Sequence, residues 1–243
     1  MDDFRNAFEE RLQEIEVYLD LLDSLEREVQ GGSPRLGQNG TIITMQQQKI
    51  LYSCVYLQLY NLVESTVTRC LDAVSTTIVY HRHQPKDLSN SFRGEWVRFI
   101  ARTHTDLTPD NRLQYALELC DHLVDARPIT PSFKIEKGGG GNWADEEIYD
   151  LICRRLCLPW RVDSDVQSAI KRPFRDGKGA LASIKNIRNE LAHGSRSFSE
   201  CGENVTVSDL RHLTRWTADY LRAIVDCFKT SIDNREYLLP DRR

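Results

Sequence analysis

The sequence has no long apolar run. No stretch of its 243 residues approaches the roughly 18 consecutive apolar residues that a membrane-spanning helix needs. The first ten residues, MDDFRNAFEE, are acidic, whereas a secretory signal begins with basic residues followed by an apolar segment. These absences predict a protein of the cytoplasm that makes no membrane contact.

A disulfide framework is also missing. The seven cysteines are an odd number and follow no disulfide-type spacing. Five of them lie in helix-like runs, namely Cys54, Cys70, Cys120, Cys153 and Cys227. We therefore expect reduced thiols that pack as small hydrophobic side chains in the core.

Metal and nucleotide motifs are lacking as well. His81 and His83 with Cys153 and Cys157 do not have the spacing of a zinc finger, a zinc ribbon or an HExxH helix. The glycine run Lys137–Asn142 (KGGGGN) is not followed by a Lys-Ser/Thr pair, and no strand precedes it, so it indicates a connector rather than a phosphate loop. The sequence predicts no metal and no cofactor.

No segment alternates apolar and polar residues as a strand would, but several show helical periodicity. From Phe4 to Val29 apolar residues recur at steps of three and four, which predicts a long amphipathic helix. Its narrow seam suits either a neighbouring helix or the same helix of a second subunit. Thr44 with Gln47 marks the start of a second helix, apolar on most of its circumference and so central in a bundle.

Shorter helical segments, separated in part by prolines, follow these two. They are expected at Phe92–Arg102, Asn111–Asp125, Asp145–Cys157, Ala180–His193 and Ser208–Asp233. The predicted fold is an all-α, up-and-down helical bundle with an additional long N-terminal helix. The predicted division places that helix and its loop in residues 1–40 and the bundle in residues 41–243.

Charge is unevenly distributed along the chain. Residues 1–30 contain three arginines and ten acidic residues, whereas residues 151–200 contain ten basic and five acidic residues. The net charge of -4 is not typical of a general nucleic-acid binder. The basic excess nevertheless coincides with the stretch IKNIRNELAHGSRSF, which ends a helix on His193 and Gly194.

Arg188 and His193 lie in that stretch. At 100° per residue, Arg188 is about 40° from Ile184 and borders the buried stripe, whereas His193 is about 180° away. The two converge only if the helix loosens at Gly194 or if a second chain closes the site. In the plainer interpretation, Arg188 is solvated or salt-bridged and His193 complements the helix dipole.

Three blocks of the chain carry a family resemblance. The pattern R-x4-H, with Asn directly after the Arg, lies within SIKNIRNELAHGSRSFSECG, preceded by LYNLVEST and followed by VSDLRHLTRW. Together, from about Ile50 to Ser231, they resemble the HEPN superfamily (higher eukaryotes and prokaryotes nucleotide-binding), in particular a free-standing prokaryotic nuclease family. The first 40 residues carry no recognisable part of this resemblance.

The resemblance implies a homodimeric, metal-independent endoribonuclease, with catalytic residues Arg188 and His193. Arg188 would bind phosphate oxygens and His193 would transfer protons, while Asn189 would orient the imidazole. Asn61 and Glu64 would line the site, with Glu64 pairing Arg188 or tuning His193. The alternative for this last pair is a solvent-exposed carboxylate and an interhelical hydrogen bond.

Basic residues near the motif are the candidate RNA contacts. Lys178, Lys185 and Arg196 would follow the RNA backbone, although such residues often only solvate a surface. Tyr60 is a candidate for base stacking, with core packing as the alternative. Family analogy suggests a defence or toxin role, with an antitoxin or partner protein. The competing function is a non-catalytic module that binds a nucleotide, RNA or protein.

Overall fold

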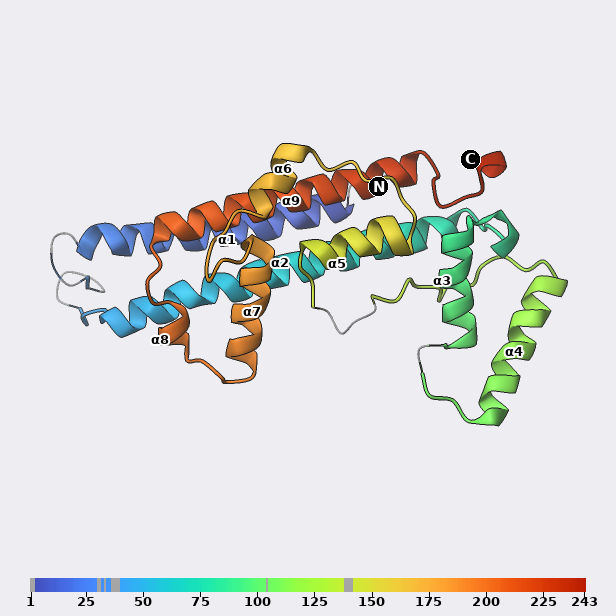
Figure 1. Cartoon of the computed structure of the whole chain (residues 1–243), viewed down its shortest axis with the longest axis horizontal. Helices are drawn as coiled ribbons and strands as arrows, with labels where there is room; N and C mark the ends of the chain where they lie inside the picture. Colours follow the sequence, from blue (N-terminus) through green and yellow to red (C-terminus); the bar gives the residue numbers. More distant parts are fainter. Residues whose placement is uncertain (1–2, 30–31, 33, 36–39, 104, 138–141) are drawn as a thin grey trace. The chain divides into compact units, whose positions relative to one another are not determined.

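The computed structural model describes residues 3–29, 32, 34–35, 40–103, 105–137 and 142–243, and the described residues form helices joined by loops (Figure 1). Isolated bridges are the only β pairings among them, so the predicted all-α class is confirmed. None of the helices in these ranges is long and apolar enough to cross a membrane. The α-helices are α1 (Asp3–Val29), α2 (Met45–Tyr80), α3 (Asn90–Ala101), α4 (Pro109–Val124), α5 (Asp145–Tyr149), α6 (Ser164–Ile170), α7 (Ala180–Ala192), α8 (Phe198–Cys201) and α9 (Val207–Asp233).

The chain divides into two compact units that are interleaved along the sequence. Unit 1 comprises residues 1–66, 142–145 and 162–223, and unit 2 comprises residues 67–141, 146–161 and 224–243. Both α2 and α9 begin in unit 1 and end in unit 2. The N-terminal helix α1 belongs to unit 1, together with the first part of α2 and with α7.

Helix α1 buries its apolar seam within unit 1. Its core side chains are at most 9% exposed and recur at helical steps: Phe4, Phe8, Leu12, Ile15, Leu19, Leu22 and Leu25. Its acidic flank pairs with α9: Arg222 Nε lies 2.9 Å from Glu9 Oε1, and Arg211 Nη2 lies 2.7 Å from Asp20 Oδ1. The seam therefore has its partner inside the chain.

Helix α2 begins as the sequence predicts. The Thr44 amide donates to Gln47 Oε1 at 2.8 Å, and the Gln47 amide donates to Thr44 Oγ1 at 3.2 Å. In unit 1 this helix buries residues around most of its circumference, including Tyr56, Leu59 and Tyr60. An almost fully buried helix needs neighbours on several sides, as the prediction of a central helix required.

Helix α8 approaches the start of α2 within unit 1. A Cβ added at Gly202 would overlap the backbone carbonyl of Lys49, so only glycine fits there. Lys49 Nζ also lies 2.7 Å from Glu203 Oε1, which tethers the same two segments.

Helix α7 carries the basic motif. Its buried stripe consists of Leu181, Ile184, Ile187 and Leu191. The helix ends at Ala192, one residue before the predicted end, and Gly194 follows with a φ of +66°. The left-handed glycine turns the chain away immediately after His193.

Unit 2 contains a buried ion pair. Glu95 of α3 is 2% exposed, and Arg155 donates to it through Nε and Nη2 at 2.8 and 2.7 Å. Arg155 belongs to a π-helical segment, Asp150–Arg155, which continues α5 where the sequence predicts one uniform helix to Cys157. The bidentate pair satisfies a carboxylate that would be costly to bury alone.

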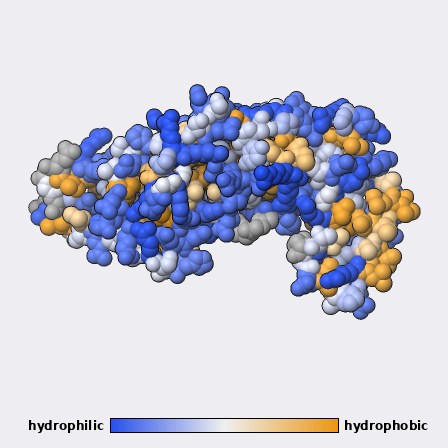
Figure 2. All heavy atoms as spheres, viewed as in Figure 1, coloured by the Kyte–Doolittle hydropathy of each residue, from blue (hydrophilic) through white to orange (hydrophobic). Residues whose placement is uncertain are grey.

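Helix α4, also in unit 2, buries little of its length. Among its side chains, Leu113, Leu117 and Val124 are exposed, and Figure 2 shows apolar residues gathered over this helix. Because α4 buries so little of its surface, Cys120 is exposed, and the prediction of a core thiol is wrong at that position. The seven cysteines are free, with Cys70 and Cys227 buried as expected.

Candidate active site

Arg188 is held against an aromatic ring. Its guanidinium carbon lies 4.2 Å from the ring centroid of Tyr60 on α2, within the range of a cation–π contact. Tyr60 is 1% exposed, and burial raises the pKa of its hydroxyl, while the charge of Arg188 opposes that rise. The buried ring therefore serves as a fixed support for a partly exposed cation.

A hydrogen bond fixes the same guanidinium from a second direction. Arg188 Nη1 donates to Asn189 Oδ1 at 2.8 Å, and Asn189 Nδ2 donates to Asn142 Oδ1 at 3.4 Å. The carboxamide thus links α7 to the segment that precedes α5 in unit 1. Asn189 was expected to orient the imidazole of His193, but its side chain is engaged with Arg188 instead.

His193 lies at the C-terminal cap of α7. Its backbone amide donates to the carbonyl of Asn189 at 2.9 Å, and the residue is exposed to solvent. Among the described residues, no side-chain hydrogen bond reaches its imidazole. The ring is therefore accessible to a ligand, and no partner within the described chain fixes its orientation.

Glu64 and Lys185 lie close to the Arg188 support. The charge of Glu64 raises the pKa of Tyr60 and that of Lys185 lowers it, although burial has the larger effect. Glu64 lies one turn after Tyr60 on α2 and is half-buried. The structure therefore gathers both signs of charge around the Tyr60 ring.

The remaining predicted site residues are Asn61, Lys178 and Arg196, and they differ in their exposure and in their contacts within the chain. Asn61 is exposed on α2, and Lys178 is exposed before α7. Arg196 is engaged within the chain, because Nη1 donates to Glu190 Oε2 at 3.0 Å and Nη2 to the Glu200 carbonyl at 3.3 Å. Its charge is therefore partly neutralised within the chain.

Sequence reasoning missed Asn142. It is 47 residues away from Asn189 and directly follows a glycine run, residues 138–141, that lies outside the described residues. A lone asparagine after glycines gives no periodic signal, so only the fold reveals the contact. Within the described ranges, no group of three or more His, Cys, Asp or Glu side chains is arranged to hold a metal ion.

The arrangement combines a fixed cation with an accessible imidazole. A guanidinium binds phosphate oxygens in a bidentate manner, and an imidazole changes protonation near neutral pH. They are anchored to the same helix but at different positions around its axis, about 140° apart.

A family model described as HEPN_MAE_28990-like HEPN matches residues 2–237. The match extends over α1, which sequence reasoning had left outside the resemblance. Neither the curated proteins nor the solved structures include a match to the chain.

Proposed function

Because the chain belongs to the HEPN family whose model spans nearly its whole length, we propose that it is a metal-independent endoribonuclease. The observation that carries this proposal is the fixed guanidinium of Arg188 on the helix whose exposed cap is His193. RNA supplies its own nucleophile, the 2′-hydroxyl, so the protein needs to move protons and stabilise negative charge.

In the proposed reaction, the 2′-oxygen forms a bond to phosphorus and the bond from phosphorus to the 5′-oxygen breaks. The proton leaves the 2′-hydroxyl and a proton is delivered to the departing 5′-oxygen. His193 transfers protons, and Arg188 binds the non-bridging oxygens of the phosphorane. The products are a 2′,3′-cyclic phosphate, or the 3′-phosphate from its hydrolysis, and a 5′-hydroxyl.

A homodimer is part of the proposal. The approximate angle between Arg188 and His193 on α7 supports a site completed by a second copy of the motif. Two imidazoles would then share the tasks of base and acid. Asn189 and Tyr60 position Arg188 in each copy, with Glu64 beside them and Asn61 at the rim.

The proposed substrate, RNA, would lie along the surface that carries Lys178, Lys185 and Arg196. Lys178 and Lys185 would contact its backbone, and Arg196 would do so while retaining Glu190 as a partner. The proposed setting is the prokaryotic cytoplasm, in antiviral defence or a toxin–antitoxin pair, with an antitoxin or other partner protein that restrains the activity.

The second candidate is a non-catalytic RNA- or nucleotide-binding module. It is favoured by the side-chain contacts of Asn189, which fix Arg188 for recognition and leave the imidazole of His193 without an orienting bond among the described residues. In such a module, Arg188 holds the phosphate and His193 contributes only to the surface.

The two functions are separated by an assay with labelled single-stranded RNA in EDTA. The proposal expects cleavage by the wild type that His193→Ala and Arg188→Ala both lose, with cyclic phosphate and 5′-hydroxyl ends. Binding without cleavage by the wild type would identify the module instead. Activity that disappears in EDTA, or that persists in His193→Ala, would contradict the metal-free mechanism at this site.

A further inference from the structure

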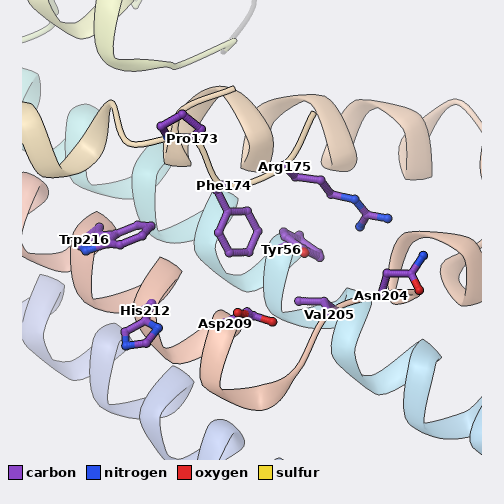
Figure 3. A pocket seen from close by; sticks show the side chains of 9 residues that line it. All are labelled: Tyr56, Pro173, Phe174, Arg175, Asn204, Val205, Asp209, His212 and Trp216. Atoms are coloured by element: carbon purple, nitrogen blue, oxygen red, sulfur yellow. The ribbon is translucent and has the colours of Figure 1, made fainter. Parts of the chain in front are cut away.

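A pocket of about 250 Å³ lies within unit 1, the unit that also contains Arg188. Figure 3 shows its side chains coming from α2, from the loop before α7, from the loop after α8 and from α9. Pockets for drug-sized molecules begin at roughly 300 Å³, so this one suits a single ring system.

Aromatic rings form much of the wall. His212 and Trp216, one turn apart on α9, are stacked with their centroids 6.1 Å apart and their planes 19° from parallel. Phe174 meets Tyr56 edge to face, with a centroid distance of 6.5 Å and an angle of 65°. Rings of this kind accept the face of a planar ligand.

The wall also carries a carboxylate that is held in place. Asp209 Oδ2 accepts from the amide of Thr206 at 2.9 Å and from its hydroxyl at 2.7 Å. Among the described residues, nothing donates to Asp209 Oδ1. The carboxylate therefore has one oxygen available as an acceptor for a ligand.

The pocket lining also includes a buried hydroxyl, that of Tyr56. The oxygen of Tyr56 is buried and, among the described residues, makes no hydrogen bond of normal geometry, although Arg175 lies close enough to lower its pKa. Burial raises the pKa of Tyr56 to about 12, against the opposing charge of Arg175, so the hydroxyl stays protonated at neutral pH. Arg175 is itself fixed, since Nη1 donates to the Cys201 carbonyl at 2.6 Å and Nη2 to the Glu203 carbonyl at 3.2 Å.

The pocket and the Arg188 site share one helix. Tyr56 lines the pocket and Tyr60 supports Arg188, and residues four apart on α2 lie on the same face with a rise of about 6 Å. A nucleotide strand with a phosphate at Arg188 therefore has this pocket within reach of an adjacent base.

We propose that this pocket binds one base of the RNA strand, selecting a base with an exocyclic amino group. The proposal rests on the proposed function, because it takes RNA as the ligand. The His212–Trp216 stack receives the base face, and Asp209 accepts from the amino group. Uracil lacks that group, and its N3–H donor lies between two carbonyl oxygens, which a carboxylate repels. Adenine, cytosine and guanine are accordingly preferred over uracil.

The test measures binding separately from cleavage. RNA 12-mers with 2′-O-methyl groups, which cannot be cut by 2′-hydroxyl attack, are made as homopolymers of A, C and U and titrated by fluorescence anisotropy. The proteins are the wild type, His212→Ala and Asp209→Asn, with Tyr80→Ala in unit 2 as the control for losing an exposed ring. His212 is exposed, so its removal leaves the fold intact, which the thermal midpoint verifies.

The expected result is a preference of the wild type for A and C over U. His212→Ala should weaken binding of the preferred oligomers roughly 5- to 150-fold, the range found for loss of one base stack. Asp209→Asn should remove most of the preference and Tyr80→Ala should change nothing. Equal affinity for all three oligomers, or a His212→Ala protein that binds like the wild type, would overturn the pocket assignment.

Cleavage of unmodified RNA by the same proteins distinguishes the two proposals. If the wild type cuts RNA and both pocket variants cut it with unchanged base preference, the base pocket is wrong and the nuclease stands. If the wild type cuts nothing but binds the oligomers with the expected preference, the nuclease is wrong and the base pocket stands on an RNA-binding module.

Discussion

At the scale of the residue, Tyr60 carries the most informative contact. The sequence left base stacking and core packing open for this ring. The structure buries it, as core packing requires, and also places it under the guanidinium of Arg188. Periodicity cannot reveal this contact, because the packing of each helix by itself already accounts for the positions of Tyr60 and Arg188.

We predict that Tyr60→Leu lowers kcat/KM for RNA cleavage about 2- to 30-fold, the equivalent of losing a cation–π contact of roughly 0.5–2 kcal/mol. Tyr60→Phe keeps the ring and should cut RNA at a rate close to that of the wild type. The measurement is initial cleavage rates, with circular dichroism to confirm folding. Equal losses in the Leu and Phe proteins would assign the effect to the hydroxyl rather than to the ring.

Glu236 provides a prediction for pH. Burial tends to raise the pKa of its carboxyl, but hydrogen bonds from Arg161 and Ser231 prevail and the pKa is lowered. Arg161 Nη1 lies 3.0 Å from Glu236 Oε2 in unit 2. A lowered pKa in the folded state contributes stability that is present above the unfolded value, 4.5, and is lost as the pH falls through the folded value.

We therefore expect Glu236→Gln to reduce the free energy of unfolding at pH 7 by about 1–3 kcal/mol, as for a hydrogen bond to a charged partner. The deficit should shrink as the pH falls below the unfolded value of 4.5 and through the lower folded value, because protonation of the wild-type carboxyl then removes the same interaction. Urea unfolding at pH 7 and pH 3 measures this, with Glu118→Gln on the exposed face of α4 as the control. A deficit that stays constant with pH would contradict the linkage.

At the scale of the element, long helices were the predictable part. The starts of α2 and α7 follow from a capping pair and from apolar periodicity, and both lie within a residue or two of their expected positions. Helices α6 and α8 span seven and four residues, too few for a periodic signal. The apolar pattern of the π-helical segment Asp150–Arg155 cannot be distinguished in the sequence from that of an α-helix.

The contact of α8 with α2 leads to a prediction for Gly202. Gly202→Ala places a methyl group on the Lys49 carbonyl, and backbone must shift to relieve the overlap. We expect a loss of about 1–3 kcal/mol or more in the free energy of unfolding. Gly94→Ala is the matched control, because its Cβ meets nothing within 4 Å and a helical alanine adds up to about 1 kcal/mol.

Chemical denaturation of both proteins measures these changes in the free energy of unfolding. The expected order of stability is Gly94→Ala at or above the wild type and Gly202→Ala below it. If the two substitutions were equally tolerated, α8 would not be closely packed on α2 in solution.

At the scale of the whole molecule, the open question is the number of copies. Arg188 and the exposed His193 lie at different angles around α7, and the proposed nuclease completes its site with a second chain. The helical wheel predicts this shared site. The partner of α1, which periodicity left open, is α9 of the same chain, as their ion pairs show.

We predict a dimer at micromolar concentration, measured by light scattering coupled to size exclusion. When His193→Ala subunits are added to the wild type, activity should fall, because a mixed dimer keeps only one of the two imidazoles that the shared site uses. A strict monomer that still cleaves RNA, or activity that added His193→Ala subunits leave unchanged, would contradict the shared site.

The interleaving of the two units has a consequence for how such a gene changes. Unit 1 takes its residues from three stretches, and unit 2 takes the two gaps between them and residues 224–243. Any recombination point between residues 67 and 223 therefore separates parts of both units. A single crossover in that interval therefore cannot replace one unit with its counterpart from another protein and leave the other unit unchanged. Descendants of this chain are therefore expected to diverge by point substitution and by loop insertion, and to pass on the two units together.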